Sequence, residues 1–200
     1  MPAPDDFNVE DYYVAFEDTY YEGPWVAAPR VLKVFKVGQY LAEVLKSARR
    51  CLQVDAEIPA LVATLAAVDY AAGFHAGRES RHTDYVRYIK DFLPASYGPL
   101  AERIYTDLRC GLVHNLVAIN PWRPAESPLF LLVPDSPKHL SIEDDRIVWS
   151  TRTFIEHVYQ AWIIFSHALI MQPDVHSIDR FNARFDRLDG AGALMAKLPS

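Results

Sequence analysis

Residues 58–77, IPALVATLAAVDYAAGFHAG, constrain the fold more strongly than any other stretch of this chain. The segment is rich in alanine and apolar on almost every face of a helical wheel, and Pro59 stands near its start, where a first helical turn favours proline. A helix that is apolar nearly all round must be surrounded by other elements, so the sequence predicts a central helix here. Gly77 is a reasonable residue to end it.

Asp69 interrupts this apolar run, in which His75 is the only other side chain that can carry a charge near neutral pH. A buried carboxylate needs a partner, because desolvating an unpaired charge is costly. One interpretation is a hydrogen bond to a neighbouring tyrosine or to the backbone. The other is a contact that orients an arginine or histidine of a later helix.

Further segments carry apolar residues at helical spacing, and Ser150 or Thr151 is placed to cap the helix that follows. Short strand-like runs at 129–133, 138–142 and 146–149 predict a small antiparallel hairpin or meander inserted between helices. We therefore predict an all-α fold, a bundle of four to five helices with a small β insert. The predicted helices are 31–52, 58–77, 82–93, 100–119 and 151–172.

The predicted organisation has three parts. An acidic, aromatic arm at residues 1–29 precedes the helical bundle at 30–172, whose insert spans about 129–149, and a tail at 173–200 follows. The arm has two interpretations: an acidic face exposed to solvent on a docked segment, or a segment that recognises a partner or covers a cationic pocket. The tail has a weak helical stripe between Ile178 and Leu188.

Composition predicts a soluble protein of the cytoplasm. With 200 residues, half of them hydrophobic, the chain suits one domain with a real core. Its two cysteines give no secreted disulfide framework and no zinc pattern, and the N-terminus lacks the features of a signal peptide. The most apolar window, 161–171, is too short to span a bilayer, so no contact with a membrane is expected.

Charge does not decide whether the chain acts on nucleic acid. The net charge is -6, but residues 1–22 hold seven acidic side chains and no Lys or Arg, while the other 178 residues hold 20 basic and 19 acidic side chains. The body of the protein is therefore close to neutral. The chain has no repeat of fixed period, glycine-rich phosphate loop, nucleophile elbow or dense cluster of metal ligands, which argues against P-loop, Rossmann, serine-hydrolase and common zinc enzymes. We predict no cofactor and no metal.

The segment Leu100–Ile119, LAERIYTDLRCGLVHNLVAI, places Arg109 and His114 on one predicted helix. Five residues apart, the two side chains leave an ideal α-helix roughly 140° from each other, so they do not sit side by side. Three solutions remain open: the helix is distorted near Gly111, the long arginine reaches round, or a second copy of the helix completes the site.

Arginine and histidine together are the smallest set of side chains that can catalyse RNA cleavage by the RNA's own 2′-hydroxyl. Histidine titrates near neutral pH and moves a proton, and arginine stabilises charge on the phosphate oxygens, with no need for a metal. A structural interpretation stands beside this one. Arg109 is then an exposed surface residue, and His114 binds the last carbonyl groups of the helix.

The sequence LRCGLVHN, which follows the Ala-rich helix, resembles the HEPN superfamily of all-α domains with an Arg-x4-6-His motif. The resemblance covers about residues 30–119 and the helix 151–172. It implies a metal-independent endoribonuclease, of toxin–antitoxin or antiviral type, in which a homodimer brings two motifs together. Arg109 and His114 are then catalytic and Asn115 and Asp69 support them. Relatives often have Asn directly after the arginine, where this chain has Cys110.

The leading hypothesis is thus a dimeric HEPN-type ribonuclease acting on RNA, with an antitoxin or another protein as a further expected partner. The alternative is a non-catalytic helical module that binds a protein or nucleotide through the acidic N-terminus or the basic helix 81–90. A third hypothesis is an antitoxin or immunity protein, which the acidity of the chain favours.

Overall fold

The computed structural model describes residues 29–115, 118, 130–171 and 174–190. The interpretations of the acidic arm fall outside these residues, as do those of the end of the predicted helix 100–119. Within the described residues the chain is mainly helical with one small sheet, so the predicted all-α fold with a β insert is confirmed.

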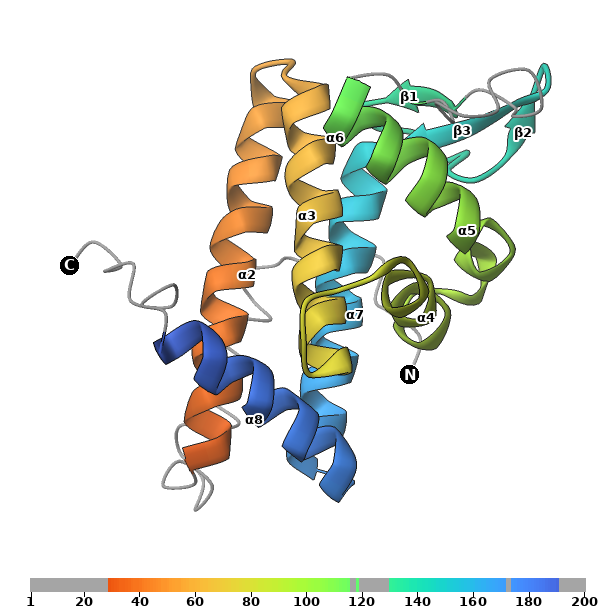
Figure 1. The fold of residues 1–200 in the computed structure, drawn as a ribbon. Helices are drawn as coiled ribbons and strands as arrows, with labels where there is room; N and C mark the ends of the chain where they lie inside the picture. Colours follow the sequence, from red (N-terminus) through yellow and green to blue (C-terminus); the bar gives the residue numbers. More distant parts are fainter. Residues whose placement is uncertain (1–28, 116–117, 119–129, 172–173, 191–200) are drawn as a thin grey trace.

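Three long helices lie side by side and form the body of the molecule (Figure 1). These are α2 (Pro29–Gln53), α3 (Glu57–Ala76) and α7 (Thr151–Met171). Helix α3 packs against both of the others and also against α4 (His82–Phe92) and α8 (Val175–Gly190), as its apolar sequence predicts. Their facing side chains form the core, which includes Leu41, Leu45, Leu61, Leu65, Phe74, Ile89 and Phe154.

Helix α2 runs through Gly38 without a break, and this glycine closely faces α7. A Cβ atom at this position would lie 2.9 Å from Nε1 of Trp162 on α7. Glycine costs helix propensity here, but it lets the indole ring of Trp162 lie against the α2 backbone. Ser150 provides the predicted cap of α7, since its Oγ accepts a hydrogen bond of 3.3 Å from the backbone N–H of Thr153.

The predicted tail contains α8, which crosses the end of α3 (Figure 1). Its Phe181 ring lies 5.0 Å from the ring of Phe74, and both side chains are buried. Gly77 allows this close crossing. It ends α3 in the left-handed conformation, at φ +75°, and a Cβ atom here would lie only 2.8 Å from Cα of Arg180.

The predicted helix 100–119 is helical through Asn115 but is not uniform. A 3₁₀ segment η1 (Ala95–Leu100) leads into α5 (Ala101–Arg103), a π-helical segment η2 (Ile104–Cys110), and then α6 (Gly111–Asn115). The hydrogen bonds of a π-helix join residues five apart instead of four, which widens the turn. The change back to α-helical geometry occurs at Gly111.

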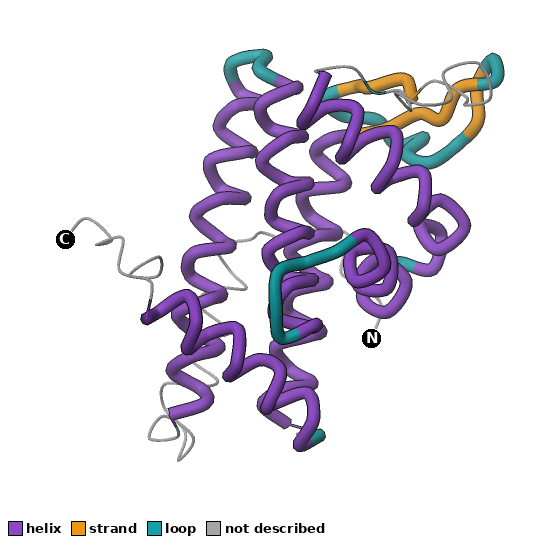
Figure 2. Tube along the Cα trace, in the orientation of Figure 1, coloured by secondary structure: helices purple, strands orange, loops and turns teal. Residues whose placement is uncertain are grey.

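The insert is a three-stranded sheet that packs at one end of the bundle, drawn in orange in Figure 2. Strands β2 (Ile142–Glu143) and β3 (Arg146–Ser150) form an antiparallel hairpin, as predicted, but the predicted run 138–142 is mostly turn and becomes a strand only at its end. The turn residues Asp144 and Asp145 both have positive φ, as in a type I′ turn. Strand β1 (Phe130–Val133) pairs with β3 in parallel, so the sheet is not a meander. The chain between the first two runs does not return as an adjacent antiparallel strand, which a meander requires.

Helix α3 is long and apolar enough to cross a membrane by length and composition alone. However, 56% of its apolar window is buried inside the bundle. Core helices of soluble proteins pass the same test, so the fold is compatible with the predicted soluble protein.

Candidate functional site

Arg109 lies at the edge where η2 meets α3, and three groups hold its side chain. Its Nε donates a hydrogen bond of 2.9 Å to Oδ2 of Asp69, on α3. Its guanidinium carbon lies 5.4 Å from the centre of the Tyr105 ring, one helical turn earlier, in a cation–π contact. Its NH1 group lies 4.0 Å from Sγ of Cys110. The orientation of the guanidinium group is therefore fixed from several sides.

Of the two interpretations of Asp69 that the sequence allows, the structure therefore shows the contact with an arginine of a later helix, Arg109. The side chains of Asp69 and Arg109 are 24% and 25% exposed, so solvent reaches the ion pair at one edge. Burial is the largest single influence and lowers the pKa of the guanidinium group, but the hydrogen bond to Asp69, the charge of Asp69 and smaller contributions from Tyr105 and Cys110 together raise it above its ordinary value. Arg109 carries its positive charge at every relevant pH.

The π-helical segment changes the angle between the positions of Arg109 and His114 around the helix. It ends at Cys110, so the helix is distorted directly before Gly111, as one of the three predicted solutions requires. The positions of an ideal α-helix do not apply across this junction. His114 and Asn115 belong to α6, which packs against α3, and their side chains lie outside the described part of the structure.

The neighbourhood of Arg109 includes two tyrosines and a histidine that the sequence motif does not contain. The imidazole of His82 lies 4.5 Å from the Tyr105 ring, centre to centre, and its Nε2 lies 2.5 Å from Oε2 of Glu102. Tyr85 is fully buried and feels the charges of Asp69 and Arg109; burial first, and then Asp69, raise its pKa. His82 and Tyr85 belong to α4, so only the fold brings them to this neighbourhood, whereas Tyr105 lies on η2 with the arginine.

The Tyr85 hydroxyl has no hydrogen-bond partner among the described residues. A buried hydroxyl without a partner is costly. Tyr85 is close enough for the charges of Asp69 and Arg109 to act on its buried hydroxyl. It is a feature of the candidate site that no pattern in the sequence predicts.

A second polar cluster joins the sheet to the bundle. Nδ1 of His139 accepts a hydrogen bond of 2.9 Å from the N–H of Ser150, which leaves the proton of neutral His139 on Nε2. This Nε2–H donates to the Tyr97 hydroxyl at 2.6 Å, and that hydroxyl donates to Nδ1 of His157 at 2.8 Å. Each donor in this chain of hydrogen bonds thus has an acceptor. This arrangement fits a structural role for His157 in the core.

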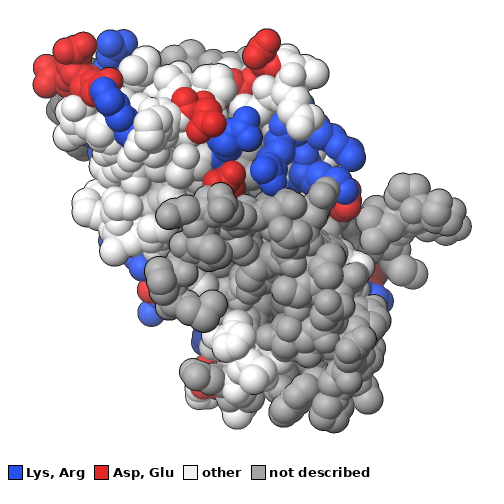
Figure 3. Space-filling view, turned by 180° about the vertical axis from the view of Figure 1, so that it is seen from behind, with Lys and Arg blue, Asp and Glu red and all other residues white. Residues whose placement is uncertain are grey.

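The Lys and Arg side chains are unevenly spread over the surface. Figure 3 shows a group of them close together on the face opposite to that of Figure 1. At the end of the bundle where α7 begins, Arg49 of α2 and Arg152 both lower the pKa of Glu156, although burial raises it more. Arg152 also pairs with Asp135 at 3.0 Å.

Chemically, Arg109 offers a fixed cation at a solvent-accessible edge. Among the described residues, Asp69 accepts from Nε and NH1 makes only a weak 4.0 Å contact with sulfur, so no strong acceptor there holds the terminal nitrogens, which are the donors that suit an anion. The described residues contain no group of three or more His, Cys, Asp or Glu placed to hold a metal ion. Comparison with protein-family models, with curated proteins and with solved structures found no match to this chain.

Proposed function

We propose that this protein is a metal-independent endoribonuclease of HEPN type, in which His114 transfers protons and Arg109 stabilises the phosphate. The observation that carries the proposal is the ion pair between Arg109 and Asp69. The pair supports this role, because transition-state stabilisation requires donors that are held in place before the substrate arrives. The cytoplasm, where RNA is available, is the proposed location.

In the proposed reaction, the 2′-hydroxyl of the RNA attacks the adjacent phosphorus while a histidine accepts its proton. The bond from phosphorus to the 5′-oxygen breaks, and that oxygen takes up a proton as it leaves. The products are a 2′,3′-cyclic phosphate and a 5′-hydroxyl end. Arg109 binds the non-bridging oxygens, whose charge grows in the transition state.

A homodimer through the face that carries Arg109 is part of the proposal. Beside Asp69, α3 turns a stripe of small and apolar residues outward, formed by Val62, Ala63, Ala66 and Tyr70. A shallow groove of about 190 Å³ is lined by Ala63, Ala66 and Tyr70 of this stripe together with Tyr40 and Val44 of α2. Val113, next to His114 on α6, is 43% exposed. A second copy packed on this stripe would bring two Arg109/His114 pairs to one interface.

The test is RNA cleavage by the purified protein in the presence of EDTA. We expect cleavage that leaves 2′,3′-cyclic phosphate ends, and a loss of about 100-fold or more in rate for His114→Ala and for Arg109→Ala. The matched control is His167→Ala, since His167 is exposed on α7 away from the motif. This control should cleave at the wild-type rate.

Circular dichroism and a thermal melt on each variant separate loss of chemistry from loss of fold. Intact RNA across structured and unstructured substrates would contradict the proposal and favour a binding module. Cleavage by His114→Ala at the rate of the His167→Ala control would do the same. So would activity that EDTA abolishes.

A further inference from the structure

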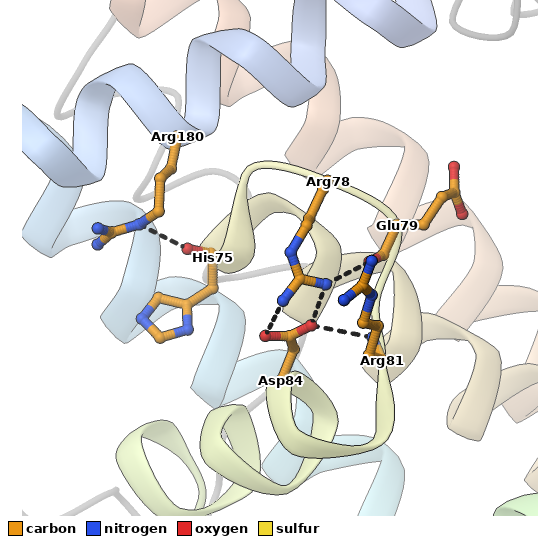
Figure 4. A network of polar contacts seen from close by, with 6 residues as sticks. All are labelled: His75, Arg78, Glu79, Arg81, Asp84 and Arg180. Carbon is orange, nitrogen blue, oxygen red and sulfur yellow. Dashed lines mark hydrogen bonds and ion pairs between the residues drawn. The ribbon is translucent and has the colours of Figure 1, made fainter.

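The end of α3, α4 and α8 enclose a polar cleft of about 370 Å³ that is separate from the surroundings of Arg109. Small-molecule sites in proteins begin at about this size. The cleft is lined by His75, Arg78, Asp84, Arg87, Asp91 and Arg180, with Ala76. Figure 4 shows part of this network, with Arg180 reaching the end of α3 from α8.

One of the three arginines in the cleft is already neutralised. Arg78 forms two parallel bonds with Asp84, of 2.6 Å from NH1 and 2.9 Å from NH2. The same carboxylate accepts the backbone N–H of Arg81 at 3.0 Å, at the start of α4 (Figure 4). Asp84 and Arg78 therefore form a closed structural pair, and neither is free to hold a ligand.

Arg180 is held in place without being neutralised. Its Nε donates to the backbone carbonyl of His75 at 3.0 Å, and its NH2 donates to Oγ of Ser177 at 2.9 Å. Neither acceptor is charged, and no carboxylate pairs with Arg180 within the described residues. Gly77 permits this geometry, since it lets the α8 backbone pass against the end of α3. The result is a fixed guanidinium group that keeps its whole charge for an anion.

Arg87 supplies a second cation whose pairing is loose. Its Nε lies 3.8 Å from Oδ2 of Asp91, and the two side chains are 74% and 46% exposed. An exposed pair at this distance contributes little, so an anion can replace it at low cost. Asp91 would then keep free oxygen atoms that can accept hydrogen bonds from hydroxyl groups.

His75 completes the cleft as a neutral donor or acceptor. Its ring is packed edge-on against Phe92 and Phe165, at 5.2 and 5.6 Å between centres, which fixes its plane. No hydrogen bond reaches its ring nitrogens from the described residues. Burial lowers the pKa of this imidazole, and Asp91 opposes the shift while Arg180 adds to it. An added anion would act in the direction of Asp91 and raise the pKa.

We infer that this cleft binds a small hydroxylated phosphate monoester, such as a sugar phosphate, with Arg180 and Arg87 on the phosphate and Asp91 on the hydroxyl groups. The arginines suit phosphate oxygens, which they can contact through two N–H groups. The carboxylate of Asp91 accepts from hydroxyls but repels a second phosphate, so it selects against a polyanion such as an RNA strand. This inference does not depend on the proposed ribonuclease activity.

The experiment is a calorimetric titration of the full-length protein with ribose 5-phosphate, inorganic phosphate and ribose. We expect saturable binding of ribose 5-phosphate, weaker binding of inorganic phosphate and none of ribose. Arg87→Gln should weaken the binding of ribose 5-phosphate about tenfold, or about 1.4 kcal/mol. The exposed Lys90→Gln, on the same helix but outside the cleft, should leave it unchanged.

Arg180→Gln should abolish the binding, and the exposed position of Arg87 keeps the test decisive if the Arg180 variant does not fold. Imidazole NMR provides a second reading, because ribose 5-phosphate should raise the pKa of His75 in the wild type and not in Arg180→Gln. No saturable binding of ribose 5-phosphate would overturn the inference. Equal losses in Arg87→Gln and Lys90→Gln would also overturn it, as would equal affinity for inorganic phosphate or tighter binding of a short single-stranded RNA.

Discussion

Nε of Arg109 lies 2.9 Å from Oδ2 of Asp69, across 40 residues of chain, and this pair joins the π-helical segment to the central helix. It explains why a carboxylate, Asp69, interrupts the apolar run of α3. The pair fixes the direction of the guanidinium group, and both side chains remain partly exposed to solvent.

Asp69→Asn should lower RNA cleavage more than it lowers stability. Asparagine keeps the shape and can still accept a hydrogen bond, but it removes the charge that orients Arg109. We expect a fall in cleavage rate of about tenfold and a loss of about 1 kcal/mol or less in the free energy of unfolding, since the pair is partly exposed. Cleavage kinetics and urea unfolding of the same preparation measure both effects.

The exposed Asp55→Asn, outside the central helix, is the control for loss of one negative charge. If the two variants cleave RNA at equal rates, the ion pair does not position Arg109 for catalysis. Arg109→Lys is a complementary change, because lysine keeps the charge and loses the fixed planar group. It should cleave more slowly than Asp69→Asn.

The stripe on α3 should hold the dimer together. Ala66→Glu places a carboxylate in its middle, at an exposed position where the isolated subunit tolerates it. We expect a monomer in light scattering, unchanged helix content and little RNA cleavage. Lys90→Glu is the matched control, because it also adds a carboxylate, but on an exposed face of α4 outside the stripe. This variant should remain dimeric. A wild-type protein that is monomeric at every concentration would contradict the prediction.

The cluster of His139, Tyr97 and His157 should make stability depend on pH. Burial, followed by the nearby His157, lowers the pKa of His139 to about 4 from an ordinary value near 6.5. Between these values the unfolded chain binds more protons than the folded one, so stability increases with pH. The contribution of neutral His139 to the free energy of unfolding is fully present above about pH 6.5. It is lost as the pH falls toward about 4, and the loss from this group is at most about 3 kcal/mol.

Urea unfolding at about pH 7.5 and about pH 5 measures this loss. His139→Gln should be less stable at neutral pH and should lose less on acidification than the wild type. His167→Gln, at an exposed position, should follow the wild type at both values. A steeper loss in His139→Gln than in the wild type would show that the histidine does not carry the pH dependence.

The sequence predicts the long helices well, because each has an apolar stripe at helical spacing that its neighbours bury. It also predicts Ser150 as a cap and the Asp69–Arg109 contact as one of two choices. The π-helical segment has no such pattern, since a change in hydrogen bonding over two turns leaves the spacing of apolar residues almost unchanged. The parallel pairing of β1 with β3 depends on the path of the chain in space, which local periodicity does not contain.

The residues around the two candidate sites show the same division. Arg109 is visible through its motif, and Tyr105 stands four residues before it on the same segment. His82 and Tyr85, by contrast, come near only through the packing of α4 against α3 and η2. The polar cleft is further from prediction still. Arg87 and Arg180 stand 93 positions apart in the printed sequence, and no pattern relates them before α8 crosses α3.

Gly77→Ala tests that crossing. Gly77 has φ +75°, which costs any other residue about 1 kcal/mol or more, and its added Cβ would lie 2.8 Å from Cα of Arg180. We expect a loss of about 2 kcal/mol or more in the free energy of unfolding and weaker binding of ribose 5-phosphate, because α8 must move away and take Arg180 with it. Gly98→Ala is the control: a Cβ there meets nothing within 4 Å, so its melting temperature should match that of the wild type. Equal stability of the two alanine variants would mean that α8 does not pack on the end of α3 as closely as the cleft requires.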